Sequence, residues 1–451
     1  MKKLYIELGI FFTAKRSRKN AKKQLKKVHR RESRARAIAH RQRRSAIFGP
    51  RSIIAGMLSE QTSIEISMPQ TSLHLDVPST FSMLQAPEQA LNLVSSFALT
   101  HRNKSISDVF VDFSKISAQD LGAHAVLGKL VEEVGLQARF QNAKIAWKGN
   151  YPKDKAQQRF IRSMGIIRLL GISGHYLSLA EASKIHLFAR KSRHDVRALN
   201  VKAETKTDQH NAVQRFADHV NRCLQREDIK LTDTARMEMC TYVAEIIDNA
   251  ENHAGMVDWT IQGYLDTHLE QPECEIVIFN FGKSIAETLE ALPRDGYTWT
   301  DQIGPYLEKH HNNGWFSPKW RECDLLTLIA LQGSVSSMNN TDETDRGQGT
   351  ADLIEFFQTM NKERNLENRG AATMYILSGK TQVLFDGTYE LKSKDDGPRV
   401  IAFNVENDLN LRPDPSCVRA LNEASFPGTI IGIKFPVKAD SLEPAPAEAH
   451  K

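Results

Sequence analysis

Cysteine is scarce in this sequence. The 451 residues include five cysteines, none of which forms a C-x-x-C pair, and their number is odd. Such a set argues against a disulfide framework and a cysteine-based zinc site, and it is typical of a reducing compartment. We therefore expect a cytoplasmic protein. The cysteines are Cys223, Cys240, Cys274, Cys323 and Cys417.

Long apolar runs are also missing. No stretch approaches the roughly 20 apolar residues that a membrane-spanning helix needs, so we expect no membrane span. The apolar segment Leu4–Ala14 is short, contains Glu7 and lacks a small-residue cleavage site, which argues against a secretory signal. An Arg-rich start that is poor in acidic residues leaves an organelle transit peptide open as an alternative. The length suits two or three globular domains.

Acidic residues are nearly absent from the first 44 positions. These positions hold 17 Lys and Arg against two Glu, a balance of +15, whereas the whole chain carries +6. Residues 15–46 have few apolar side chains and many like charges, so we expect residues 1–50 to form a disordered basic arm. An arm of this kind binds polyanions by releasing counterions, which favours nucleic acid as its partner. An acidic protein, a membrane surface or a solubilising tail are the alternatives. No aromatic residue interleaves these charges, so base stacking is not indicated.

Composition divides the rest of the chain. We expect a connector over residues 51–104 with one strand and one short helix, because Pro, Ser, Thr and Gln separate short apolar pieces there. Two folded α/β domains are expected over residues 105–190 and 208–438. The charged residues 191–207 predict a linker between them, and the Pro/Ala/Glu-rich residues 439–451 predict a disordered tail.

The first of these domains has an alternating strand and helix pattern. Ile106–Ile116 predicts a strand, Ala118–Leu136 an amphipathic helix, Gln137–Trp147 a second strand, and Asp154–Leu169 another helix. This order resembles a STAS domain, the fold of anti-sigma-factor antagonists. That family often carries a phosphorylatable Ser in an Asp-Ser-Ser-Gly turn, but the matching residues 120–123 are Asp-Leu-Gly-Ala. The resemblance therefore implies no phosphoserine switch, and a domain used only for packing is the alternative.

The second domain contains an unusual helix over Met237–Gly255. Glu245, Asn249 and His253 follow one another at four-residue steps and share one face of it, opposite an apolar stripe. A carboxylate can orient and deprotonate a water, and an amide oxygen one turn away can hold Mg²⁺. A solvated polar face would have the same pattern. The apolar stripe consists of Met239, Tyr242, Val243, Ile246, Ile247 and Ala250.

Three further motifs follow this helix in a fixed order. The strand Glu275–Phe279 runs into Asn280-Phe281-Gly282-Lys283-Ser284; Asp345-Arg346-Gly347-Gln348-Gly349-Thr350 opens an apolar-periodic helix; and Gly428-Thr429 begins a last strand. The series resembles the nucleotide-binding domain of the GHKL ATPases, which include DNA gyrase B, Hsp90, MutL and histidine kinases. The resemblance covers about half of the chain. It implies an α/β sandwich, the GHKL or Bergerat ATP-binding fold, with a mixed sheet backed by helices.

The resemblance also assigns roles. It implies that Glu245 is the catalytic residue that positions water, that Asn249 binds Mg²⁺, and that ATP is the ligand. The glycines Gly347 and Gly349 would let backbone N–H groups approach phosphate oxygens at a helix N-terminus, with Arg346 as an added cation. Thr429 matches a threonine that supports the adenine pocket. His253 would make a lid contact or cap its helix.

One motif departs from the family. GHKL proteins usually have Asp-x-Gly-x-Gly, in which the Asp accepts the adenine amino group, whereas this chain has Asn280 and retains only the first glycine, Gly282. A neutral amide is a weaker acceptor than a carboxylate, so adenine specificity is less secure than phosphate binding. Lys283 would either meet a phosphate or face water.

The segment between the two glycine motifs is long. GHKL proteins place a mobile lid there, so we expect a lid over residues 286–344 that closes on ATP or contacts a protein partner. His310 and His311 lie in it without further ligands at metal-binding spacing, so a metal site is not expected. After the lid, Thr373–Leu377 and Gln382–Phe385 predict a β-hairpin.

Three functions remain open at this point. The first is an ATP- and Mg²⁺-binding GHKL ATPase that acts as a conformational switch, directed to nucleic acid by its arm, in DNA processing or defence against phage. The second is a protein kinase or regulator of the histidine-kinase or anti-sigma kind. The third is a non-catalytic interaction module with a degenerate nucleotide site. A homodimer is compatible with all three.

Overall fold

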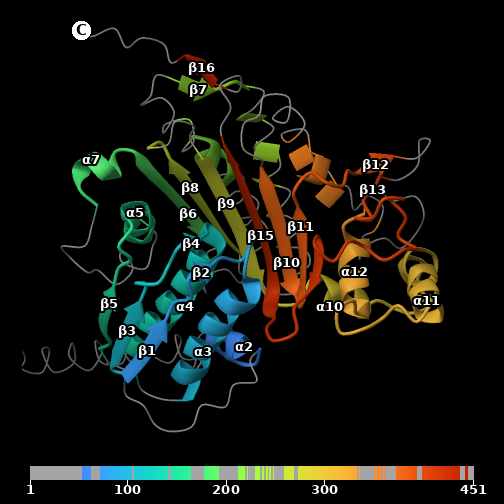
Figure 1. Cartoon of the computed structure of the whole chain (residues 1–451), viewed down its shortest axis with the longest axis horizontal. Coiled ribbons are helices and arrows are strands. Elements are labelled where there is room, and N and C mark those ends of the chain that lie inside the picture. Colours follow the sequence, from blue (N-terminus) through green and yellow to red (C-terminus); the bar gives the residue numbers. More distant parts are fainter. Residues whose placement is uncertain are drawn as a thin grey trace, which may run out of the picture.

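The computed structural model shows a mixed α/β protein built around one large sheet (Figure 1). It describes residues 53–61, 72–103, 106–140, 144–163, 177–191, 212–218, 221, 229–233, 236–237, 240–241, 243–244, 247, 259–268, 273–332, 335, 350–351, 353–355, 357–358, 361, 372–393, 399–436 and 442–444. The basic arm at residues 1–50 and the linker at 191–207, apart from Lys191, lie outside these residues. So does the tail after residue 438, apart from 442–444.

Seven strands form the large sheet, in the order β14-β11-β10-β15-β9-β8-β6. All six pairings are antiparallel, which differs from the mixed sheet we expected. Short connections account for two of these pairings, because β8 leads into β9 and β10 into β11, and a short connection joins antiparallel neighbours. The strands are β6 Ile185–Lys191, β8 Trp259–Asp266, β9 Glu273–Phe281, β10 Thr373–Gly379, β11 Thr381–Phe385, β14 Val418–Ala420 and β15 Phe426–Pro436. The hairpin predicted for β10 and β11 is confirmed.

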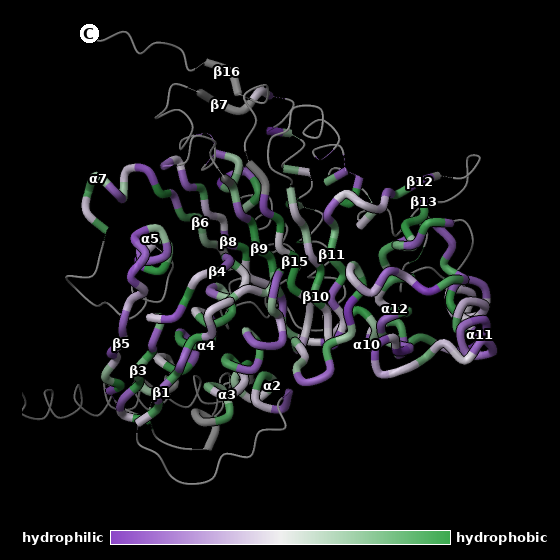
Figure 2. The backbone as a smooth tube through the Cα atoms, viewed as in Figure 1, coloured by the Kyte–Doolittle hydropathy of each residue, from purple (hydrophilic) through white to green (hydrophobic). Residues whose placement is uncertain are grey.

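Both faces of this sheet are buried. Along β9, Ile276 and Ile278 belong to one apolar cluster, whereas the alternate residues Val277, Phe279 and Phe281 belong to another. Successive side chains of a strand point to opposite faces, so each cluster covers one face of the sheet. Figure 2 shows the apolar colour concentrated in these central strands. We call the two faces the helical face, which includes Ile276, and the N-terminal face, which includes Val277.

A smaller layer covers the N-terminal face. Its parallel sheet has the order β1-β3-β5, a two-residue pair joins β2 to β4, and helix α4 contacts β8, β9 and β15 of the large sheet. The predicted strand and helix over Ile106–Leu136 are confirmed as β3 and α4. The elements are α2 Ile53–Ser59, β1 Ser72–Asp76, β2 Thr80–Phe81, α3 Pro87–Asn103, β3 Asp108–Asp112, β4 Ala118–Gln119, α4 Leu121–Phe140, β5 Ala146–Asn150, α5 Lys155–Ser163 and α7 Leu179–Ala182.

Two parts of this layer differ from the sequence expectation. Residues 51–104, expected to be a connector, supply β1 and the 17-residue helix α3, and β1 pairs with β3 along its whole length. Strand β6, expected in the first domain, pairs with β8 at the edge of the large sheet. The physical reason is that these partners are distant in sequence, and the local pattern that predicts an element does not say which sheet it joins.

The N-terminal layer docks on the sheet through the start of α4. The backbone N–H of Leu121 donates to Glu275 Oε2 on β9 at 2.9 Å. Gly122 lies against the Tyr375 hydroxyl, and any Cβ there would collide with the hydroxyl oxygen. The side-chain amide of Gln382 donates to the carbonyls of Met83 and Leu84 at 2.8 and 3.0 Å. The turn at residues 120–123 is therefore packed against the large sheet.

The expected lid contains regular structure. Between residues 286 and 332 the chain forms most of α10 (Ile285–Glu290), the π-helix η1 (Thr298–Ile303), α11 (Gly304–Asn312) and α12 (Glu322–Ala330). Leu325, Leu328 and Ile329 of α12 are fully buried on the helical face. This part of the segment is core, because its apolar residues recur at helical spacing; of residues 333–349, only residue 335 is described.

The remaining strands are short. They are β7 Ile229–Leu231, which pairs with β16 Leu442–Pro444, and β12 Lys392–Ser393, which pairs with β13 Arg399–Val400.

Candidate functional site

Five of the predicted site residues lie outside the described part of the chain. They are Glu245, Asn249, Arg346, Gly347 and Gly349. Their helices are partly described, since residues 243, 244 and 247 and residues 350, 351, 353–355, 357 and 358 are helical. Val243 and Ile247 from the first helix and Ile354 and Phe357 from the second are buried in the cluster of the helical face. Both helices therefore pack on the same face of the sheet.

Asn280 and Thr429 lie side by side on that face. Asn280 ends the apolar run of β9, and its Cα is the register partner of Thr429 on β15. Asn280 is 5% exposed and Thr429 is half-buried. Asn280 lies two positions after Ile278 in the same strand, so its side chain shares the face of that core residue. The structure thus brings together two residues that are far apart in sequence.

Gly282 forms the turn that leaves β9. Its φ is 135°, and its N–H donates to the carbonyl of Pro427 at 3.1 Å. Gly428 opposite also has φ 135°, and a Cβ there would collide with the Asn280 carbonyl oxygen. Only glycine combines that φ with so close an approach, so Gly428 fixes the spacing of β9 and β15 beside Asn280.

The residues after Gly282 begin α10. The side chain of Lys283 is exposed, so it is not part of the packed face. Ser284 is the N-cap: its hydroxyl accepts from the Glu287 N–H, and Glu287 Oε2 accepts from the Ser284 N–H at 2.7 Å. This capping box pairs two of the backbone N–H groups at the start of α10, those of Ser284 and Glu287.

A further residue, Ser378, joins this site. Its hydroxyl oxygen, 2.8 Å from Thr429 Oγ1, accepts the N–H of Ile285 at 2.8 Å and donates to the carbonyl of Gly428 at 3.1 Å. Ser378 is 1% exposed and is the register partner of Thr429 on β10. The hairpin predicted from Thr373–Leu377 and Gln382–Phe385 leaves Ser378 in the connecting turn with Gly379, Lys380 and Thr381, which is a common context for serine. The period-2 pattern of Met374 and Ile376 is the signal that could have placed it on the helical face.

The opposite face carries buried charges. Glu275 accepts the Leu121 N–H, and its Oε1 lies 3.4 Å from Lys434 Nζ. Asp120 caps α4 by accepting the Ala123 N–H at 2.8 Å, and it also accepts the Ser82 hydroxyl. Burial raises the pKa of both carboxyl groups. These groups hold the N-terminal layer to the sheet and lie behind the Asn280 face.

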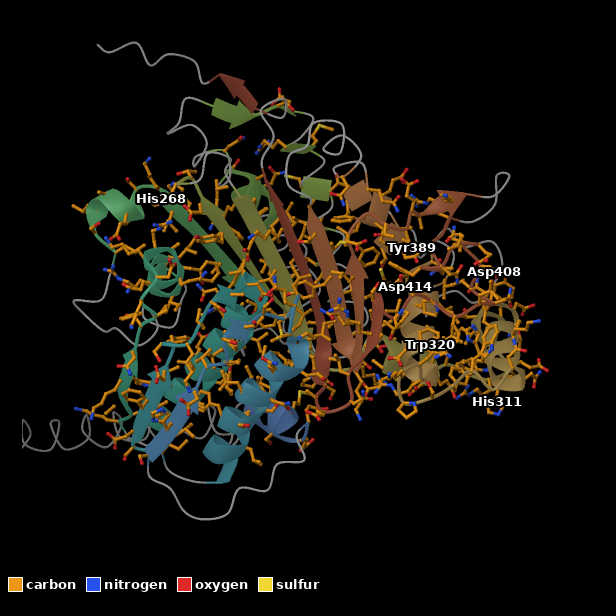
Figure 3. The ribbon with its side chains drawn as sticks, viewed as in Figure 1. His268, His311, Trp320, Tyr389, Asp408 and Asp414 are labelled. Atoms are coloured by element: carbon orange, nitrogen blue, oxygen red, sulfur yellow. The ribbon has the colours of Figure 1, made fainter. Side chains whose placement is uncertain are left out.

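Histidine side chains with ring nitrogens near other polar groups occur at two places in the described part of the chain. Both ring nitrogens of His310 are engaged, because Nδ1 accepts the Trp320 indole N–H at 3.1 Å and Nε2 lies 2.9 Å from the Leu409 carbonyl. Trp320 lies two residues before α12 and His311 belongs to α11; both are labelled in Figure 3. In the described part of the chain, one group could offer three ligand atoms within 4.8 Å: His74, Asp76 and Asp112. His74 and Asp76 are more than half exposed.

Comparison with known proteins identified no relative. A scan against family models, a search of curated proteins and a search of solved structures each found no match. No helix within the described residues has the length and apolar character of a membrane span.

Proposed function

We propose that this protein is an ATP- and Mg²⁺-binding GHKL-type ATPase that works as a nucleotide-driven conformational switch. The observation that carries the proposal is the register pairing of Asn280 with Thr429 on the helical face. The family series requires these two motifs to meet. The packing of Val243 and Ile247, and of Ile354 and Phe357, on the same face adds support, because the other two motifs flank these residues.

In this proposal the roles follow the resemblance. Glu245 would position the attacking water, and Asn249 would hold Mg²⁺, which would bridge phosphate oxygens. Gly347, Gly349 and Arg346 would receive the phosphates. Among the described residues, Asn280 and Thr429 would lie at the part of the site that receives the base of the nucleotide.

Calorimetric titration tests the site directly. Mg-ATP is titrated into wild type and Asn249→Ala, and phosphate release is followed for wild type and Glu245→Ala. We expect Asn249→Ala to weaken binding at least about tenfold, as the loss of a metal ligand does. Glu245→Ala should keep binding and lose hydrolysis. Absence of binding by folded wild type would leave the non-catalytic module as the remaining interpretation, and phosphate transfer to a protein would favour the kinase.

The STAS-like turn does not favour the kinase or regulator alternative. Its first N–H groups are already used, since Leu121 donates to Glu275 and Ala123 donates to Asp120. It also has no hydroxyl group between Asp120 and Ala123. The N-terminal layer is therefore proposed as a fixed cover of the sheet.

The partner of the switch is proposed to be nucleic acid, bound by residues 15–46. Deletion of residues 1–50 should weaken binding to duplex DNA or RNA strongly at low salt. The logarithm of the wild-type affinity should fall steeply and linearly with the logarithm of salt concentration, because neutralised phosphates release counterions. Fluorescence anisotropy with both duplexes measures this. Equal binding by the deletion variant would remove nucleic acid from the proposal.

A further inference from the structure

The small parallel sheet of the N-terminal layer has a polar outer face. Leu75 of β1 and Val111 of β3 are buried in the core of the layer. His74 and Asp76 alternate with Leu75 along β1 and are exposed, so they lie on the opposite face. Figure 1 shows β1, β3 and β5 at the outside of the molecule, with α3 and α4 on the inner side. Solvent and small ions can therefore reach the outer face.

The strand register brings polar residues together at one end of this sheet. Asp76 ends β1 and Asp112 ends β3, and the two are register partners in parallel strands. Asn150 ends β5 and is the register partner of Asp112. All three residues thus lie at the carboxyl ends of parallel strands, which is where open α/β sheets bind their ligands.

Together with His74, the two aspartates form a mixed set of metal ligands. His74, Asp76 and Asp112 each offer one ligand atom, and these atoms lie within 4.8 Å of one another. His74 Nε2 is 3.6 Å from Asp76 Oδ1. Ligands that share a zinc ion about 2 Å away lie roughly 3 to 4 Å apart, so side-chain movements of about 1 Å complete the set. The imidazole favours a transition-metal ion over Mg²⁺ or Ca²⁺, which take oxygen ligands.

Neighbouring groups orient two of the three ligands. The His74 ring stacks on that of Phe110, with the ring centroids 4.7 Å apart and the planes at 23°. Asp112 Oδ1 accepts the Ser114 N–H at 2.9 Å, and the Asn150 side chain also hydrogen-bonds to Asp112. Contacts of this kind hold metal ligands in place and raise the affinity for the ion.

A surface ion pair is the competing use of these groups. Lys115 Nζ lies 4.0 Å from Asp76 Oδ1, and both side chains are more than 60% exposed. An ion pair between exposed side chains contributes only about 0 to 1 kcal/mol. A divalent ion that contacts both Asp76 and Asp112 therefore displaces Lys115.

We propose that His74, Asp76 and Asp112 bind a Zn²⁺ ion on the outer face of the parallel sheet. Three protein ligands leave a further coordination position of the ion for water or for an external ligand. The inference goes beyond the proposed function, because none of these residues belongs to the nucleotide site. The N-terminal layer separates the zinc site from the helical face.

Calorimetric titration of the full chain with Zn²⁺ alone, without nucleotide, tests the site. Wild type should bind about one equivalent that His74→Ala and Asp112→Asn each weaken at least about tenfold. Asp112→Asn keeps an oxygen that accepts the Ser114 N–H, so the turn after β3 is retained. Co²⁺ reports the ligands directly: its visible absorption should appear with wild type, disappear on addition of Zn²⁺, and be lost in His74→Ala.

A matched control changes another histidine that contacts an aspartate. His268 Nδ1 lies 2.8 Å from Asp266 Oδ1, and Arg159 lies 3.6 Å from the second oxygen of that carboxylate. This pair has a competing cation at the carboxylate and no second aspartate in a ligand group. His268→Ala should therefore bind Zn²⁺ as wild type does. Asn249→Ala should also leave zinc binding unchanged, because Asn249 is assigned to the nucleotide site.

The outcomes separate this inference from the proposed function. Absence of zinc binding by folded wild type would overturn the inference. Equal affinity in wild type, His74→Ala and Asp112→Asn would overturn it too, since the ion would then be held adventitiously elsewhere. Zinc binding that depends on His74 and Asp112, in a protein that does not bind Mg-ATP, would support the inference and overturn the proposed function.

Discussion

At the residue scale, His124 shows how a polar group is tolerated deep in the core. It is 2% exposed, and its ring lies among those of Phe81, Phe113 and Phe160. Its Nε2 lies 2.9 Å from the amide oxygen of Gln119, which only accepts, so Nε2 carries the proton of the neutral ring. Burial lowers the pKa of His124 to about 3.

This pKa predicts a loss of stability in mild acid. Below its ordinary pKa of about 6.5, His124 binds a proton in the unfolded chain but stays neutral in the folded chain until about pH 3. The free energy of unfolding should therefore fall by about 2 kcal/mol between pH 6.5 and pH 5 from this residue alone. Urea unfolding of wild type and His124→Phe at both pH values measures it. Buried carboxyl groups oppose the trend equally in both proteins, so parallel pH profiles would contradict the prediction.

At the element scale, a buried carboxylate joins each of the helices α4 and α12 to the large sheet. For α4 the acceptor is Glu275, which receives the Leu121 N–H. For α12 it is Asp324, which is fully buried, receives the Arg321 N–H at 2.7 Å and forms an ion pair with the Arg321 side chain at 2.9 Å. Thr381 of β11 donates to Asp324 at 2.6 Å, so the same carboxylate connects α12 to the hairpin.

The α4 contact predicts different costs for two substitutions of Glu275. Glu275→Gln keeps an acceptor for the Leu121 N–H and loses only the ion pair with Lys434, whose side chain is 40% exposed, so it should change the free energy of unfolding by less than about 1 kcal/mol. Glu275→Ala leaves the N–H without its acceptor and should cost about 2 to 3 kcal/mol. Urea unfolding at neutral pH compares the two. Equal costs would mean that the hydrogen bond is not what fixes α4.

The α12 contact predicts a large effect from a single carboxylate. Asp324→Ala removes the partner of a half-buried Arg321 and should lower the free energy of unfolding by about 3 to 5 kcal/mol. Glu322 is two residues away and exposed, so Glu322→Ala should stay within about 0.5 kcal/mol. Thermal unfolding of both variants measures the difference. A small effect at Asp324 would show that the packing of Leu325 and Leu328 is enough to hold α12 on the sheet.

Elements with a strong local pattern could be predicted from the sequence, and their partners could not. The β10–β11 hairpin was predictable because its turn and its pairing are both local. By contrast, β1 was expected in a connector, and its pairing with β3 depends on residues more than 30 positions away. Asn280 and Thr429 are farther apart still, and only their place in the motif series suggested that they meet. Ser378 was missed because serine beside glycine is typical of a turn.

At the scale of the whole molecule, the N-terminal layer and the large sheet share one core. Val109 and Leu130 from the layer belong to the same cluster as Phe279 and Ile430 from the sheet. Removing the layer would expose the sheet residues of that cluster, which is a large apolar surface for a single protein to leave in water. The structure therefore joins the two parts without an intervening gap in the core.

This shared core predicts one cooperative unfolding transition. Calorimetry of the full chain should give a single peak for both parts, with equal calorimetric and van't Hoff enthalpies. Near-UV circular dichroism and tryptophan fluorescence should have the same midpoint, since Trp147 lies in the layer and Trp259 in the sheet. Two separate transitions would mean that the parts fold independently.

Strand β9 has a consequence for how this gene can vary. Its alternate side chains serve two different interiors, with Asn280 toward the helices and Glu275 toward α4. Deletion or insertion of one residue between Glu275 and Asn280 would move one of these two side chains, and the side chains beyond it, to the opposite face of the sheet. Point substitutions in this strand can be compensated by neighbours, but a change of length cannot. Length variants recovered from a random insertion and deletion library should therefore avoid residues 275–280, while surface turns accept them.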